Sequence, residues 1–137
     1  MRNEQDLWQY IQQGMPEVHW MRIESSVATG CFDVNACFAG IEAWIELKWD
    51  RGSLRPAQKA WGLARLRAGG NVWVLEGNPF AIRLFNFADI IRHGAYPARP
   101  VEILTLRKPN WPLLLSIVFD KNAAKERMDE KYSIFGV

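Results

Sequence analysis

The stretches Cys31-Phe32-Asp33-Val34-Asn35 and Trp44-Ile45-Glu46-Leu47-Lys48 decide the predicted fold, because in both of them charged or amide side chains recur at every second position. A period of two is typical of β-strands whose two faces differ. We therefore predict one strand over residues 31–38 and a second over residues 43–49, joined by a tight turn over residues 39–42. The two strands would form a hairpin with one apolar and one polar face.

The polar face of this hairpin would carry two carboxylates close together. The apolar faces coincide in a register that pairs Asp33 with Lys48 and turns Phe32 and Val34 to the other side. Asp33 and Glu46 then lie diagonally on one surface, about 7 Å apart, and both can reach one cation. A half-exposed hairpin with ordinary solvent-facing charges is the alternative. The segment around Glu46 is nearly continuous in apolar residues, however, and charges in a strand covered on both faces are costly unless paired or metal-bound.

Length and composition are those of a single-domain globular protein. The chain has 137 residues, of which 49% are hydrophobic and 23% are charged. We expect one domain over residues 1–137, with a core at about 22–90 and a C-terminal extension over 95–137. No membrane span or signal peptide is predicted, which indicates a cytoplasmic protein. The net charge of +2 permits a polyanionic partner without requiring one.

The chain offers oxygen ligands for a metal and few soft ones. Cys31 and Cys37 would lie about 20 Å apart along a strand, so we expect free thiols. Two histidines and no Cys-x-x-Cys motif exclude a zinc signature, and a metal here would be a hard ion. Arg51, Arg55 and Lys59 follow the carboxylates and would provide a basic rim for DNA, although a solvated helix face explains them equally well.

The remaining elements are predicted from periodicity and breaker residues. A helix capped by Ser53 is expected to pack on the sheet, and the strand, helix, strand order around it predicts a parallel pair of strands. The fold class is therefore α/β, with a mixed central sheet flanked by helices. The inward face of this helix is predicted to consist of Leu54, Ala57, Trp61, Ala64 and Ala68. Further elements are expected over residues 3–13 (helix), 71–75 (strand), 81–87 (strand), 101–106 (edge strand) and 113–132 (helix).

The order of these motifs resembles the PD-(D/E)xK nuclease superfamily, and more closely the virus-type replication-repair nucleases, the VRR-NUC group with its small phage-encoded members. The resemblance covers about residues 22–76. A proline normally precedes the first aspartate of the pattern, and Phe32 stands there in this chain. The matching elements are Glu24, Gly30-Cys31-Phe32-Asp33-Val34, Trp44-Ile45-Glu46-Leu47-Lys48, Gln58 after Pro56, and Gly69-Gly70.

The resemblance implies a restriction-endonuclease-like core and a DNA endonuclease dependent on Mg²⁺ or Mn²⁺. Asp33 and Glu46 would be metal ligands, with the Leu47 carbonyl as a third and Glu24 completing the shell directly or through water. Lys48 would orient or deprotonate the attacking water, or stabilise developing negative charge. Gln58 would position water, substrate or Lys48.

The resemblance also implies a homodimer acting on branched DNA, in the manner of a Holliday-junction resolvase. It would work in the host cytoplasm if a phage encodes it. A nicking or flap-cutting, structure-specific nuclease is the alternative among enzymes. A noncatalytic DNA-binding protein that keeps the nuclease fold is the alternative from another class.

Overall fold

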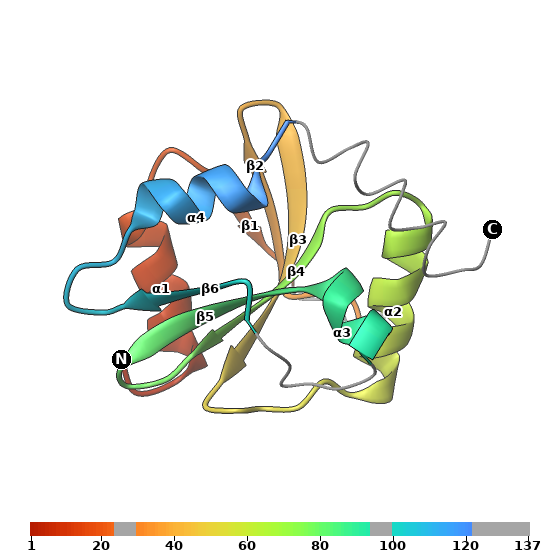
Figure 1. The fold of residues 1–137 in the computed structure, drawn as a ribbon, viewed down its shortest axis with the longest axis horizontal. Coiled ribbons are helices and arrows are strands. Elements are labelled where there is room, and N and C mark those ends of the chain that lie inside the picture. Colours follow the sequence, from red (N-terminus) through yellow and green to blue (C-terminus); the bar gives the residue numbers. More distant parts are fainter. Residues whose placement is uncertain (24–29, 94–99, 122–137) are drawn as a thin grey trace.

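The computed structural model describes residues 1–23, 30–93 and 100–121, which form a six-stranded sheet between two layers of helices (Figure 1). Helices α1 and α4 cover one face, and α2 and α3 cover the other. The predicted α/β class with a mixed sheet flanked by helices is confirmed. No helix of the described ranges has the length and apolar character to cross a membrane. The elements are α1 (Glu4–Gly14), β1 (His19–Arg22), β2 (Val34–Phe38), β3 (Ile41–Trp49), α2 (Pro56–Arg67), β4 (Val72–Gly77), β5 (Ala81–Asn86), α3 (Phe87–His93), β6 (Glu102–Thr105) and α4 (Trp111–Val118).

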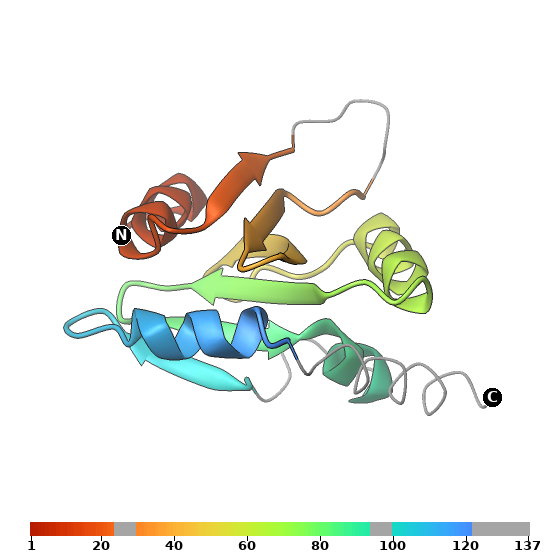
Figure 2. The ribbon, with the colours of Figure 1, turned by 90° about the horizontal axis from the view of Figure 1, so that it is seen from above.

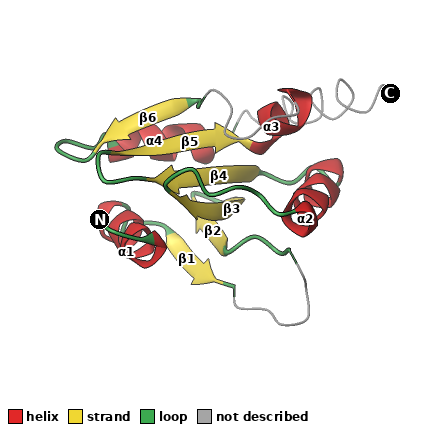
Figure 3. Ribbon diagram, turned by 90° about the horizontal axis from the view of Figure 1, so that it is seen from below, coloured by secondary structure: helices red, strands yellow, loops and turns green. Residues whose placement is uncertain are grey.

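The strands lie side by side in the order of the sequence, from β1 at one edge to β6 at the other (Figures 2 and 3). All neighbours are antiparallel except β3 and β4, which α2 connects as a crossover. The predicted parallel pair is confirmed, as are the helix at the N-terminus and the edge strand β6. β3 and β4 are the two middle strands, so the centre of the sheet is where the hairpin meets the crossover helix.

The hairpin register differs from the prediction by two residues. Val34 pairs with Ile45, and a two-residue turn of Ala39 and Gly40 joins the strands, both with positive φ (53° and 80°). This turn twists in the sense that a hairpin favours. Asp33 therefore precedes β2 and lies across from Glu46, and the predicted pairing with Lys48 is wrong. A shift of two residues keeps every side chain of β3 on its expected face.

The inward face of α2 is also displaced from the prediction. Its buried residues are Gln58, Gly62 and Leu66, whereas Trp61 is half-buried and Ala64 is exposed. A Cβ atom added at Gly62 would come within 2.6 Å of the Phe87 ring, so the glycine lets α2 approach the elements beneath it. The residue at the N-cap is Arg55 and not Ser53. Of the predicted face, Leu54 alone is fully buried, and Ala68 is exposed.

Two elements, β1 and α3, were not predicted from the sequence, and α4 is shorter than the helix predicted there. α4 begins at Trp111, where the Asn110 side chain accepts a hydrogen bond from the Leu113 backbone, and it ends at Val118. The predicted helix over residues 113–132 therefore ends early, and its part beyond residue 121 lies outside the described residues.

Each face of the sheet has its own apolar core. Leu7 and Ile11 of α1 pack with the face that carries Ile45 and Leu47, and Phe87 of α3 packs on the opposite face. Glu46 and Lys48 belong to that opposite face, because they alternate with Ile45 and Leu47 along β3. The face covered by α2 therefore holds the polar residues of the hairpin.

Candidate active site

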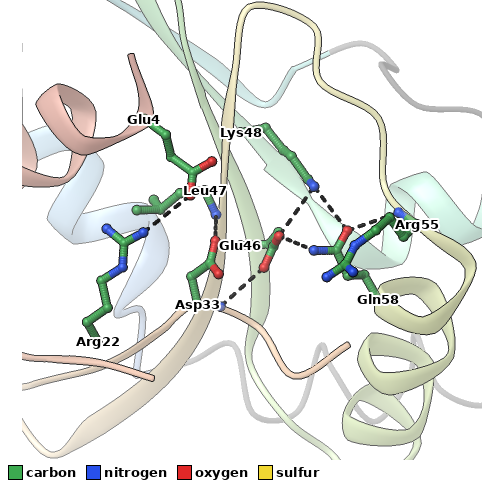
Figure 4. A network of polar contacts seen from close by, with 8 residues as sticks. All are labelled: Glu4, Arg22, Asp33, Glu46, Leu47, Lys48, Arg55 and Gln58. Carbon is green, nitrogen blue, oxygen red and sulfur yellow. Dashed lines mark hydrogen bonds and ion pairs between the residues drawn. The ribbon is translucent and has the colours of Figure 1, made fainter. Parts of the chain in front are cut away.

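Asp33 and Glu46 are joined through the backbone where β2 diverges from β3 (Figure 4). The Asp33 N–H donates to Glu46 Oε1 at 3.1 Å, and Asp33 Oδ2 accepts from the Leu47 N–H at 3.3 Å. Glu46 thus binds the backbone of Asp33, and Asp33 binds the backbone of the residue after Glu46. These reciprocal bonds hold the two carboxylates beside one another.

The α2 side of the site is a triad of side chains centred on Gln58. Its amide nitrogen donates to Glu46 Oε2 at 2.5 Å, while its amide oxygen accepts from Lys48 Nζ at 3.0 Å and from the Arg55 N–H at 2.9 Å. Lys48 Nζ also lies 3.4 Å from Glu46 Oε2. Gln58 is 4% exposed, so one buried amide orients both the carboxylate and the amine (Figure 4).

Glu46 carries its charge at a considerable electrostatic cost. The residue is 1% exposed. Burial, followed by the nearby charge of Asp33, raises the pKa of the Glu46 carboxyl to about 8, although the Lys48 amine acts in the opposite direction. A single lysine therefore does not offset the two carboxylates, and a further positive charge at this place would stabilise them.

A third carboxylate approaches from the other side, on the first turn of α1. Burial and then the charge of Asp33 raise the pKa of Glu4. Arg22 Nη2 of β1 lies 3.4 Å from Glu4 Oε1 (Figure 4). Arg22 Nη1 is buried, and no partner among the described residues bonds to it. A guanidinium with an unused donor therefore lies at the edge of the carboxylate group.

Gly30 positions the chain that leads to Asp33. Its φ is +82°, and a Cβ atom there would come within 2.2 Å of the Ala57 carbonyl oxygen. Only glycine fits this contact and this backbone conformation without strain. The segment before Asp33 is thereby seated directly against the first turn of α2, which carries Gln58.

The structure brings Asp33, Glu46, Lys48 and Gln58 together, as the sequence interpretation requires. The predicted ligand Glu24 lies outside the described residues. Arg51, Arg55 and Lys59 are exposed around the end of β3 and the start of α2, on the Lys48 side of the site. Two residues at the site were missed: Glu4 and Arg22. The only signal for Glu4 was its place in the first turn of a helix, where an acidic residue already has an explanation in the helix dipole.

The donor set fits a hard divalent cation. In the described ranges, no three histidine, cysteine, aspartate or glutamate side chains already converge as a metal site. Asp33 and Glu46 nevertheless present carboxylate oxygens, with Glu4 adjacent. Oxygen donors of this kind suit Mg²⁺ and Mn²⁺, whose charge would offset the repulsion at Glu46.

Comparisons with known proteins find a likeness among solved structures. No protein-family model matches the chain, and no curated protein matches it. Among solved structures, the chain is similar to Hjc of Archaeoglobus fulgidus, a Holliday junction resolvase from an archaeal hyperthermophile, with a TM-score of 0.48 and 19% sequence identity. The likeness covers 61% of this chain and 72% of that chain.

Proposed function

We propose that this chain is a metal-dependent endonuclease that hydrolyses phosphodiester bonds in DNA. The observation that carries the proposal is the buried unit of Asp33, Glu46, Lys48 and Gln58, in which two carboxylates, an amine and an amide are held within hydrogen-bonding distance. A buried carboxyl group whose pKa is raised, as at Glu46, is expensive to maintain beside a second carboxylate, and perturbed titratable groups of this kind concentrate at catalytic sites. We interpret the chain as a nuclease of the PD-(D/E)xK type on the same residues.

Asp33 and Glu46 would hold Mg²⁺ or Mn²⁺, with Glu4 as a further acid on the side of α1. The Leu47 carbonyl and Glu24 remain proposed as additional ligands. When bound, the metal would neutralise charge on the phosphoryl oxygens and lower the pKa of a water molecule. Arg22, whose guanidinium lies beside Glu4, would bind a phosphate oxygen there.

Lys48 would act on the attacking water or on the developing charge. Hydrolysis forms a bond from a water oxygen to phosphorus, breaks the bond to the leaving oxygen, and requires that the water lose a proton. Lys48 Nζ is fixed by Gln58 and Glu46 and is largely buried, with 13% of its side chain exposed. Gln58 therefore serves as a positioning residue, because it sets the direction of the amine without itself needing to touch substrate.

We propose branched DNA, with a Holliday junction as the leading case, as the substrate. This choice rests on the motif resemblance, and the same resemblance suggests a homodimer, because a four-way junction needs two matched incisions. Exposed Arg51, Arg55 and Lys59 would then contact the DNA backbone next to the site.

The test is a cleavage assay of the purified protein on duplex, single-stranded, flap and four-way DNA, in Mg²⁺, in Mn²⁺ and in EDTA. We expect metal-dependent cuts, and symmetric paired cuts on the four-way substrate. Cleavage that persists undiminished in EDTA would refute the metal mechanism. Binding without cleavage in any metal would favour the noncatalytic alternative, and preferred cutting of the flap would favour the flap nuclease.

A further inference from the structure

Beyond Glu46 on the same face of the sheet, an arginine is stacked on two tryptophans. The Arg65 guanidinium carbon lies 5.1 Å from the ring centroid of Trp44 and 5.1 Å from that of Trp61. The two indoles contact each other edge to face, with centroids 5.2 Å apart. Trp61 in turn lies against Phe32, 5.1 Å between centroids. Such cation–π contacts hold the planar guanidinium in a fixed orientation at little cost in solvation.

The donors of this guanidinium are not used inside the described part of the chain. No hydrogen bond or ion pair from its side chain is present there, although Glu42 lines the same depression. Arg65 is exposed and borders two open depressions, each of about 290 Å³. One depression runs toward Gly69 and Gly70, and the other lies along α2 at Trp61. A preoriented arginine with free donors on an open surface is suited to an anion with several oxygen atoms.

The position of Arg65 relative to the carboxylates follows from the two elements that carry them. Trp44 and Glu46 are two residues apart and share one face of β3, so their Cα atoms are about 7 Å apart. α2 places Gln58 against Glu46 and Trp61 against Trp44. Arg65 therefore lies beside the carboxylates, one step along β3 toward the β2–β3 turn.

We propose that Arg65, stacked on Trp44 and Trp61, is a phosphate-binding subsite for the DNA strand that is cut. It would hold the phosphodiester next to the scissile one, on the side of the β2–β3 turn, and so fix the register of the strand over Asp33 and Glu46. This inference rests on the proposed nuclease function and adds to it a binding site for a defined group of the substrate.

The test combines a charge deletion in the protein with a charge deletion in the DNA. The cut made by the wild-type protein is mapped first. Two substrates are then prepared, each with one uncharged methylphosphonate next to the cut, on one side or the other. Affinity is measured in EDTA across a range of salt concentrations, and single-turnover cleavage is measured in Mg²⁺.

The variants are Arg65→Ala, Arg65→Lys and the control Arg67→Ala. The control removes the same charge two residues along, on another side of α2.

On unmodified DNA, Arg65→Ala is expected to weaken binding about tenfold, the scale of one hydrogen-bonded contact to a charged group. It should also reduce the slope of log affinity against log salt by about 1. Arg65→Lys should keep the slope and lose part of the affinity, because an ammonium lacks the planar fork. On one of the two methylphosphonate substrates, wild type and Arg65→Ala should bind equally.

Three results would overturn the subsite, and they separate it from the nuclease proposal. Metal-dependent cleavage with Arg65→Ala indistinguishable from Arg67→Ala would remove the subsite alone. The subsite would also be refuted if Arg65→Ala weakened binding equally on both modified substrates. A lowered melting temperature with unchanged affinity and salt slope would mean that Arg65 only packs on the indoles. If the wild-type protein neither binds nor cuts DNA, both proposals fail.

Discussion

The backbone N–H of Asp33 binds the side chain of Glu46, thirteen residues away, and the carboxylate of Asp33 binds the backbone that follows Glu46. Each of the two residues thus fixes the other at the start of β2. These two bonds join the start of β2 to β3, and the side chain of Gln58 completes the unit from α2. The geometry of the carboxylates is therefore a property of the hairpin and of the first turn of α2.

We expect Asp33→Asn and Glu46→Gln each to lower the single-turnover cleavage rate by at least ~10²-fold, the scale of losing one key electrostatic group. DNA binding in EDTA should persist or tighten, because repulsion from a carboxylate is removed. The matched control is Glu17→Gln, which changes the same charge at an exposed position before β1. Normal cutting by either site variant would make that carboxylate a structural group and not a ligand.

Lys48→Ala is expected to slow cleavage while leaving Mn²⁺ affinity, measured by calorimetry, nearly unchanged. Lys48→Arg should also be slow, because a guanidinium cannot give up its proton and is too large for the place between Gln58 and Glu46. Gln58→Ala should behave in the same direction and shift the pH profile of the rate, since it frees the amine. Equal rates in all variants would assign Lys48 to charge balance alone.

Glu4→Gln should reduce the cleavage rate, because it removes the carboxylate that faces Asp33 from α1. Asp6→Asn, on the same helical turn, is the control for the loss of charge from this helix. Circular dichroism melting of both variants monitors the fold. If Glu4→Gln and Asp6→Asn cut equally fast, Glu4 serves only to hold Arg22.

The stability of the metal-free protein should depend on pH through Glu46. Its pKa is raised from 4.5 to about 8 on folding, so the folded protein favours the protonated carboxyl. The contribution of Glu46 to the free energy of unfolding is therefore most favourable near and below pH 4.5. This contribution falls as the pH rises toward 8. Melting in EDTA between pH 5 and pH 9 should show this fall, and Glu46→Gln should remove it. A wild-type melting temperature that rises over this range in parallel with the variant would contradict the raised pKa.

Gly62→Ala should destabilise the protein by about 1–3 kcal/mol, because the added methyl group meets the Phe87 ring at 2.6 Å and the Phe32 ring at 3.0 Å. Urea unfolding followed by tryptophan fluorescence gives the value. The same substitution in an exposed helix interior would stabilise by about 0.5–1 kcal/mol, so the sign of the change decides whether α2 packs this closely.

The sequence was sufficient for the polar face of the hairpin but not for its register. Alternation assigns Glu46 and Lys48 to one face whatever the register, since a shift of two residues restores every face. The register depends on the turn, and nothing in the sequence indicates that Ala39 adopts a positive φ, which is uncommon outside glycine, asparagine and aspartate. The grouping of Glu46 and Lys48 on one face was therefore predictable, although the partner of Asp33 was not.

The face of α2 could not be derived from hydrophobicity. Ala57 and Trp61 have the helical spacing of an apolar stripe, but the structure buries Gln58 and Gly62 in their place. Gln58 is buried because the site supplies its hydrogen-bond partners, and Gly62 because two aromatic rings need the space. Both reasons exist only in the folded protein. The same is true of Glu4, which reaches Asp33 through the packing of α1.

Gly30 bears on how this chain can change over evolutionary time. The chain touches the α2 backbone at Gly30 so closely that any side chain would push the two segments apart, and the displacement would pass directly to Asp33. No neighbouring substitution can make room, because the obstacle is the main chain of Ala57 and Gln58. We expect relatives of this protein to retain glycine here, including lineages in which the carboxylates themselves have been replaced.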